Sequence, residues 1–176
     1  MKIALLPPLS YTYEAYEKYM KNDLISCDNI QEIIDSVNHK DSQLGIIPLE
    51  NRIIGKINSY DLKGLSIIKK IKLPIEMALG GIGYRNKINK VISKKEALMQ
   101  CSEYLSFNQL ESIEESSTVA GIEKILEKNL IDTAAIGSEK ALRHYGLKVY
   151  ERDISNLKPN YTIFGVISLC QNDFAF

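Results

Sequence analysis

The alternation of short apolar runs with helix-like segments is the feature that most constrains the fold of this 176-residue chain. The runs have the length of β-strands, and turn or cap residues bound them. Strands and helices that alternate in this way predict open α/β sheets rather than a sandwich or a helical bundle. We expect strands at residues 2–6, 43–49, 65–73, 76–84, 90–93, 110–114, 134–136, 148–152 and 161–168.

Residues that cap helix N-termini stand at the start of the expected helices. Thr12 is the expected cap of the first helix. Asn29 and Glu32 form an N-x-x-E variant of the capping box, and Ser93 and Glu96 form an S-x-x-E box. Further signals are a cap within Ser116–Thr118, a cap at Ser138, and Gly146 as the residue that ends the last helix.

Two proline-containing turns divide the chain into two expected lobes. Pro74 separates two apolar runs, and Lys158–Pro159 precedes the last one. If the chain crosses between lobes at both turns, residues 1–74 and 160–176 form a first subdomain and residues 75–159 a second. Together they would make one catalytic module with a cleft between its lobes, where small ligands commonly bind.

Charge balance and sparse cysteines narrow the classes of function. The chain has 22 basic and 22 acidic residues, which argues against a nucleic-acid binder or a membrane-surface protein. No apolar stretch approaches the ~20 residues of a membrane span, and the initial apolar run is too short for a signal peptide. Cys27, Cys101 and Cys170 lie far apart, as in proteins of a reducing compartment, so we expect a cytoplasmic protein. His39 and His144 lack the spacing of metal ligands, and we expect no metal site.

Four polar clusters fall where strands end and helices begin. They are Ser10–Thr12, Glu50–Asn51, Ser93 with Gln100, and Ser116–Thr118. Helix N-termini present N–H groups and partial positive charge, so converging ones suit an anionic ligand. Each cluster is also what an ordinary helix cap looks like, so the pattern alone supports only an α/β domain that binds a small molecule, with anions among the candidates.

Five sequence blocks resemble the motifs of prephenate dehydratases, in the order of that family and at compatible spacing. They are Ile46–Asn51 with Gly55, Ser93–Cys101, Ser117–Ala120, Ala134–Ser138 with Tyr145–Leu147, and Asn160–Phe164. In the family these blocks read P-[IL]-E-N-S-x-x-G, S-H-P-Q-A-L-x-Q-C, S-T-x-A, A-A-I-x-S…Y-G-L and N-x-T-R-F. The resemblance runs from about residue 1 to residue 170.

The resemblance implies two α/β subdomains with a cleft between them, similar to type II periplasmic binding proteins. It also implies conversion of prephenate to phenylpyruvate with loss of carbon dioxide and water, without a cofactor. Thr162 matches the threonine that donates to the leaving hydroxyl, and Glu50 matches the family's glutamate, so both are predicted catalytic residues. The predicted substrate-binding residues are Ser10, Thr12, Asn51, Arg52, Ser93, Lys94, Gln100, Ser117 and Thr118.

The departures from the family pattern lie within these motifs. Ile163 replaces the arginine of T-R-F, which removes a cation expected to hold the dianionic substrate. Arg52 stands where the family has a small hydroxyl residue, Lys94 replaces a histidine, and Leu9 replaces the glycine of G-T-F-S. A charge-assisted contact of this kind contributes about 1.5–3 kcal/mol.

Two interpretations of these departures stay open at the level of sequence. In the first, Arg52 or Lys94 supplies the charge lost at Ile163, and the enzyme remains a dehydratase. In the second, the pocket is retuned, for prephenate decarboxylation without aromatisation or for binding a small carboxylate without turnover. Retention of Thr162, Glu50, Asn51, Ser93 and Gln100 favours the first, and arogenate remains an alternative substrate.

The family resemblance also bears on how the protein is regulated and assembled. Many family members have a C-terminal ACT domain with an E-S-R-P motif, and the chain to Phe176 contains no such segment. We therefore expect that any control by phenylalanine comes from a separate regulatory chain. By analogy with the family we expect a homodimer.

Overall fold

The computed structural model describes residues 1–20, 22–57 and 60–170, and within it the chain divides into two compact units. The first unit comprises Met1–Asn51, Gly55–Leu73 and the chain from Tyr161 onward. The second comprises Arg52–Ile54 and Pro74–Asn160. Residues 171–176, which were expected in the first subdomain, lie outside the described residues.

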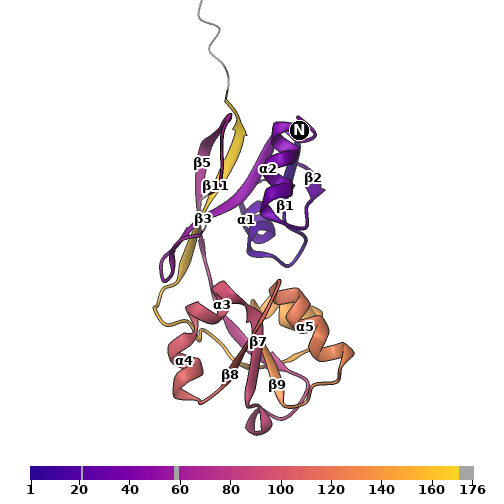
Figure 1. The fold of residues 1–176 in the computed structure, drawn as a ribbon, viewed down its shortest axis with the longest axis vertical. Helices are drawn as coiled ribbons and strands as arrows, with labels where there is room; N and C mark the ends of the chain where they lie inside the picture. The colour runs from indigo at the N-terminus through magenta and orange to yellow at the C-terminus, as the bar shows by residue number, and fades with distance from the viewer. Residues whose placement is uncertain (21, 58–59, 171–176) are drawn as a thin grey trace, which may run out of the picture. The chain divides into compact units, whose positions relative to one another are not determined.

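The first unit is built on a mixed sheet with the strand order β2-β1-β3-β11-β5, and β4 pairs with β3. β1 runs parallel to β2 and β3, whereas β11 runs antiparallel to β3. The helix α2 packs against β1, β3 and β11 (Figure 1). The strands are β1 (Lys2–Leu5), β2 (Asp23–Ser26), β3 (Leu44–Asn51), β4 (Gly55–Lys56), β5 (Leu65–Pro74) and β11 (Tyr161–Leu169), and the helices are α1 (Tyr11–Tyr19) and α2 (Ile30–Asn38).

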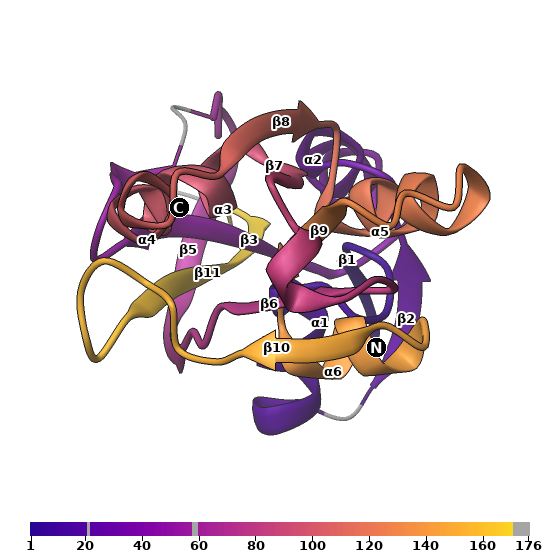
Figure 2. The same ribbon diagram turned by 90° about the horizontal axis from the view of Figure 1, so that it is seen from below.

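The second unit is built on a sheet with the strand order β10-β6-β9-β7-β8. β7 runs parallel to β8 and β9, and β6 runs antiparallel to β9 and β10. The helix α5 packs against β7 and β9, and α6 packs against β10 (Figure 2). The strands are β6 (Ala78–Gly81), β7 (Lys90–Lys94), β8 (Glu111–Glu115), β9 (Thr133–Gly137) and β10 (Lys148–Glu151), and the helices are α3 (Lys95–Gln100), α4 (Ser102–Phe107), α5 (Thr118–Glu127), α6 (Glu139–His144) and a 3-10 turn at Arg85–Lys87.

Each unit has an aliphatic core, as a sheet covered by amphipathic helices requires. In the first unit, Ile33, Ile34 and Val37 of α2 are fully or almost fully buried against Ile47 and Ile167. In the second unit the buried residues include Val91, Ile92, Ile122, Ile125, Ala134, Ala135 and Ile136. These sheets confirm the predicted α/β class. Within the described residues, no helix is long and apolar enough to cross a membrane.

Several of the predicted helix caps are confirmed. The Asn29 side chain accepts from the Glu32 amide at 3.0 Å, and the Glu32 carboxylate accepts from the Asn29 side-chain amide at 2.7 Å and from the Asp28 backbone N–H at 2.9 Å, which makes a variant of the capping box. Ser117 and Ser138 cap α5 and α6, and Gly146 follows α6 with a φ of 76°, a conformation that glycine adopts without strain.

Two predicted caps are wrong. The cap of α1 is Ser10 rather than Thr12, which lies inside the helix. The predicted Ser93–Glu96 box does not form, because β7 continues through Lys94 and keeps Ser93 inside the strand.

The predicted strand and helix ends also need correction. β3 does not end at Pro48 but continues to Asn51, and Pro48 is tolerated there because it lies at a bulge beside β11. The helical stripe after Ser93 is interrupted at Cys101, which separates α3 from α4. The strand β2 was not predicted, because its only sequence signal is Leu24–Ile25 between polar residues.

Candidate active site

Asn51 and Thr162 form the polar centre of the first unit. They lie directly opposite each other on β3 and β11, and both are buried, Asn51 completely and Thr162 with 6% exposure. The Asn51 Nδ2 donates to Thr162 Oγ1 at 3.1 Å and to the Tyr161 carbonyl at 3.0 Å. Because Oγ1 accepts this bond, the Thr162 hydroxyl proton is directed away from Asn51 and can serve as a donor to another group.

Glu50 and Ile163 lie on the other face of the same pair of strands. Successive side chains of a strand point to opposite faces, and directly opposed residues of antiparallel strands share a face. The register pairs Glu50 with Ile163, so the Glu50 carboxylate is not brought to the face that carries Thr162. Glu50 is exposed, and on its other side it pairs with Lys56 of β4. An arginine at position 163 would therefore stand across from Glu50 rather than beside Thr162.

Ser10 and Thr12 occupy the start of α1. Ser10 Oγ accepts from the Tyr13 amide at 3.1 Å and donates to the Pro7 carbonyl at 2.7 Å. Thr12 is buried, with 2% exposure. Leu9, just before the cap, has a φ of 73°, the left-handed conformation that glycine adopts readily and leucine rarely does. Leu9 thus holds a backbone conformation that the glycine of the family motif could adopt without strain.

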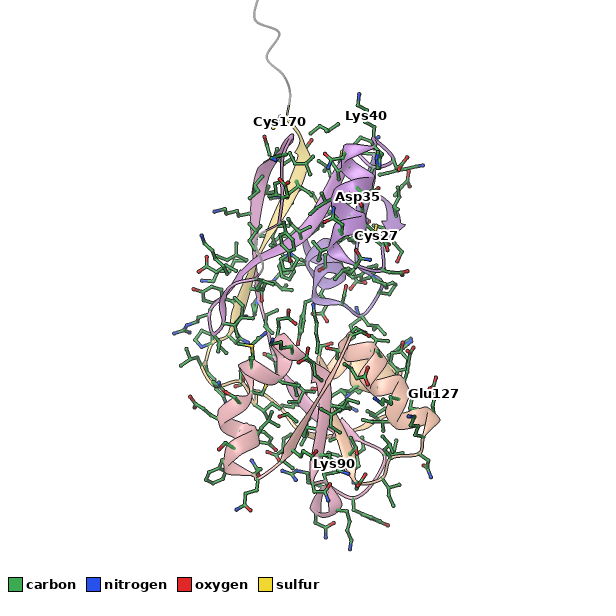
Figure 3. All side chains as sticks on the ribbon, viewed as in Figure 1. Cys27, Asp35, Lys40, Lys90, Glu127 and Cys170 are labelled. Atoms are coloured by element: carbon green, nitrogen blue, oxygen red, sulfur yellow. The ribbon has the colours of Figure 1, made fainter. Side chains whose placement is uncertain are left out.

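Ser93, Ser117 and Thr118 meet at the carboxyl ends of the parallel strands of the second unit. Lys90, labelled in Figure 3, marks the other end of β7. Ser93 is fully buried and donates to the Ile136 carbonyl at 2.7 Å. Its Oγ lies 3.3 Å from Thr118 Oγ1, and since the Ser93 proton is already donated, Thr118 is the donor between them. Ser117 Oγ accepts from the amide of residue 120 and caps α5.

A third polar cluster joins Gln100, Asn160 and Ser155 in the second unit. The Asn160 Nδ2 donates to Gln100 Oε1 at 2.8 Å and to Ser155 Oγ at 3.3 Å. All three residues are at least 94% buried. Gln100 was predicted as a site residue, but Asn160 and Ser155 were not. The signal for Asn160 was its match to the asparagine of the N-x-T-R-F motif, to which the sequence assigned no role.

The two predicted cations have local partners. Arg52 Nη1 donates to the Pro159 carbonyl at 2.6 Å, and Lys94 Nζ lies 3.5 Å from the Glu96 carboxylate. Both side chains are exposed. Neither contact uses more than part of the donors of an arginine or a lysine, so both can also bind an anion.

No group of His, Cys, Asp and Glu side chains among the described residues could hold a metal ion. Cys27 and Cys101 are buried, and burial raises the pKa of both thiols, that of Cys101 to about 12. These two thiols are therefore kept protonated and poorly nucleophilic. Cys170 is exposed, at the end of β11 (Figure 3).

Known proteins resemble this chain in sequence and in structure. The profile of the family described as prephenate dehydratase matches residues 3–172. A prephenate dehydratase of Methanocaldococcus jannaschii is 32% identical over 178 residues, which cover 94% of this chain and 63% of the relative. The crystal structure of the prephenate dehydratase from Staphylococcus aureus superposes with a TM-score of 0.74 at 26% identity, covering 98% of this chain and 68% of that chain.

The predicted likeness to periplasmic binding proteins is also confirmed at the level of fold. The periplasmic VFT2 domain of BvgS from Bordetella pertussis superposes with a TM-score of 0.53 at 10% identity, covering 96% of this chain and 80% of that domain. An identity this low supports a shared fold and nothing more.

Proposed function

Because this chain belongs to the prephenate dehydratase family, we propose that it converts prephenate to phenylpyruvate in phenylalanine biosynthesis. The chain spans 63% of the length of its methanococcal relative, so the activity of the whole protein is part of this proposal. The observation that carries it is the hydrogen bond from Asn51 to Thr162, which orients the hydroxyl that the reaction needs as a donor.

The reaction breaks two bonds and aromatises the ring. The bond between ring C1 and its carboxylate breaks, and its electron pair enters the ring as carbon dioxide leaves. The bond between C4 and its hydroxyl breaks, and the leaving oxygen takes a proton from the solvent to become water. We assign to Thr162 the hydrogen bond to that oxygen. A threonine hydroxyl is too weak an acid to give up its proton fully, so its contribution is an oriented hydrogen bond to developing negative charge.

Asn51 is then a residue that positions Thr162, in addition to its predicted contact with substrate. If Asn51 were an acceptor, the Thr162 proton would turn toward it and the reaction would lose its donor. Glu50 lies on the other face, and we now propose that its role is local to β3, β4 and β11 rather than in proton transfer.

The second unit supplies donors for the pyruvyl carboxylate of prephenate. We assign this task to the backbone N–H groups at the N-terminus of α5 and to the amide of Gln100, because the hydroxyl protons of Ser93 and Thr118 are already donated within the second unit. The partial positive charge of a helix N-terminus favours a carboxylate there. The ring carboxylate must be held less firmly, because strong stabilisation of the ground state would oppose its departure.

Compartment and assembly complete the proposal. We place the enzyme in the cytoplasm, which the two buried free thiols support. We also propose a homodimer, which the family resemblance supports. Light scattering after gel filtration tests the assembly.

The first experiment is a turnover assay on the purified 176-residue chain that follows phenylpyruvate. We expect turnover in the wild type and a loss of about 10²–10³-fold in kcat for Thr162→Ala, by analogy with removal of a single oxyanion donor. Thr162→Ser keeps a hydroxyl at the same position and should retain most of the activity. Prephenate consumption without phenylpyruvate would instead support the retuned pocket. A fully active Thr162→Ala variant would remove Thr162 from the chemistry.

A further inference from the structure

We propose that Asn160 is a positioning residue, which fixes the orientation of the Gln100 amide so that its donor end serves the substrate carboxylate. This inference rests on the proposed function and extends it to a residue with no assigned role. Asn160 precedes β11 and belongs to the second unit, as does Gln100, the last residue of α3.

The contact that carries the inference is buried and specific. Asn160 Nδ2 donates to Gln100 Oε1 at 2.8 Å, and the two residues are 3% and 6% exposed. An amide side chain has one acceptor end and one donor end. With its oxygen bound to Asn160, the Gln100 amide has its NH₂ end turned away from Asn160.

The backbone on both sides of this contact is held as well. The Asn160 carbonyl accepts from the Ile75 amide at 3.1 Å, and the preceding Pro159 carbonyl accepts from Arg52. The Gln100 carbonyl accepts from the Asn156 amide at 2.8 Å. Fixed backbones leave the side-chain amides few alternative arrangements, which is how a supporting residue defines the geometry of a binding group.

Orientation matters because the two ends of an amide act oppositely on a carboxylate. The NH₂ end donates to it, whereas the oxygen repels it. Loss of a hydrogen bond to a charged group typically reduces affinity by about tenfold or more. A residue that keeps the NH₂ end of the Gln100 amide directed toward the carboxylate therefore affects substrate affinity without contacting the substrate.

A purely structural role for Asn160 gives different expectations. Buried polar groups need partners, and Asn160 also donates to Ser155, so the cluster would stabilise the fold in either case. If that were its only role, changes at Asn160 would alter thermal stability but not the KM for prephenate. The effects of Asn160 and Gln100 on KM would then be independent.

The test is a double-mutant cycle on the full chain with prephenate, measuring KM, kcat and, by calorimetry, Kd. Asn160→Ala and Gln100→Ala should each raise KM about tenfold with a smaller change in kcat. The double variant, Asn160→Ala combined with Gln100→Ala, should have a KM no higher than that of Gln100→Ala alone, because Asn160 acts through Gln100. Ser155→Ala, which removes a second hydrogen-bond partner of the Asn160 amide, is the matched control and should leave KM within about twofold.

Asn160→Asp covers the case in which Asn160→Ala fails to fold. It has the same shape, but a carboxylate accepts only, so Gln100 would turn its NH₂ toward residue 160 and its oxygen outward. We expect KM to rise at least as much as for Asn160→Ala. An unchanged KM in a folded Asn160→Asp variant would overturn the inference.

The outcomes separate this inference from the proposed function. Wild-type turnover with additive effects in the cycle would retain the dehydratase and overturn the role of Asn160. Prephenate binding without turnover, with a non-additive cycle in Kd, would overturn the dehydratase and support the role of Asn160. A wild type that neither binds nor converts prephenate would overturn both.

Discussion

On one face of the β3–β11 pair, Asn51 and Thr162 are buried and hydrogen-bonded, whereas on the other face Glu50 is exposed across from Ile163. The departure from the family motif at position 163 falls on the exposed face. Thr162 and Ile163, which are adjacent in the motif, therefore lie in different environments. The loss of the arginine changes the surroundings of Glu50 and leaves the Asn51–Thr162 contact in place.

Apart from removal of the Thr162 hydroxyl itself, the change expected to damage the buried face most is Asn51→Asp. At neutral pH the new carboxylate accepts from Thr162 and takes its proton out of use, so we expect kcat to fall by about 10–100-fold. As the pH falls and this carboxyl protonates, it can donate to Thr162 again, and the activity relative to wild type should recover. The pH–rate profiles of Asn51→Asp and Asn51→Ala check this. Only Asn51→Asp should regain activity relative to wild type as the pH falls. Parallel profiles would contradict the orienting role of Asn51.

A change at Arg52 tests whether a cation outside position 163 holds the substrate. Arg52→Ala should raise the KM for prephenate about tenfold, because a charge-assisted contact is lost. Arg52→Lys keeps the charge and should lose less. If KM is unchanged in Arg52→Ala, the side chain serves the Pro159 carbonyl alone, and Lys94→Ala becomes the next variant to measure.

Changes on the exposed face should have little effect on catalysis. Ile163→Arg restores the family residue across from Glu50, and Glu50→Gln removes its charge. We expect each to leave kcat/KM within about twofold, with Ile163→Arg adding less than about 1 kcal/mol to the free energy of unfolding through an exposed ion pair. Steady-state kinetics and thermal unfolding measure both quantities. A tenfold fall in KM for Ile163→Arg would show that the two faces are not functionally separate.

The smallest expected effect concerns Leu9 at the start of the same unit. Leu9→Gly and Leu9→Ala remove the same side chain, but only glycine relieves the left-handed backbone. We expect Leu9→Gly to be more stable than Leu9→Ala by about 1 kcal/mol, as measured by chemical denaturation, with similar kcat/KM. Equal stability of the two variants would show that the backbone at Leu9 carries no strain.

Local patterns predicted local structure, and long-range pairing decided the rest. The box at Asn29 and Glu32 was predictable because both partners lie within one turn of helix. The predicted cap at Ser93 failed because β7 extends one residue further, pairing with β8 as far as Lys94. Nothing local could have paired Asn51 with Thr162, since 111 residues separate them.

The family resemblance located most of the candidate site residues but not their geometry. It marked Thr162 and Glu50 as a catalytic pair, whereas the strand register puts their side chains on opposite faces. It also gave Asn160 no role, because motif matching does not report which residues contact each other.

The conformation at Leu9 bears on how distant relatives are detected. A sequence alignment scores the replacement of glycine by leucine as a mismatch in a functional motif. The dihedral angle of 73° is nevertheless the one that glycine would adopt most easily. A mismatch in sequence at this position therefore coincides with a main-chain conformation that still suits glycine, so the substitution by itself is no measure of how far the backbone has diverged.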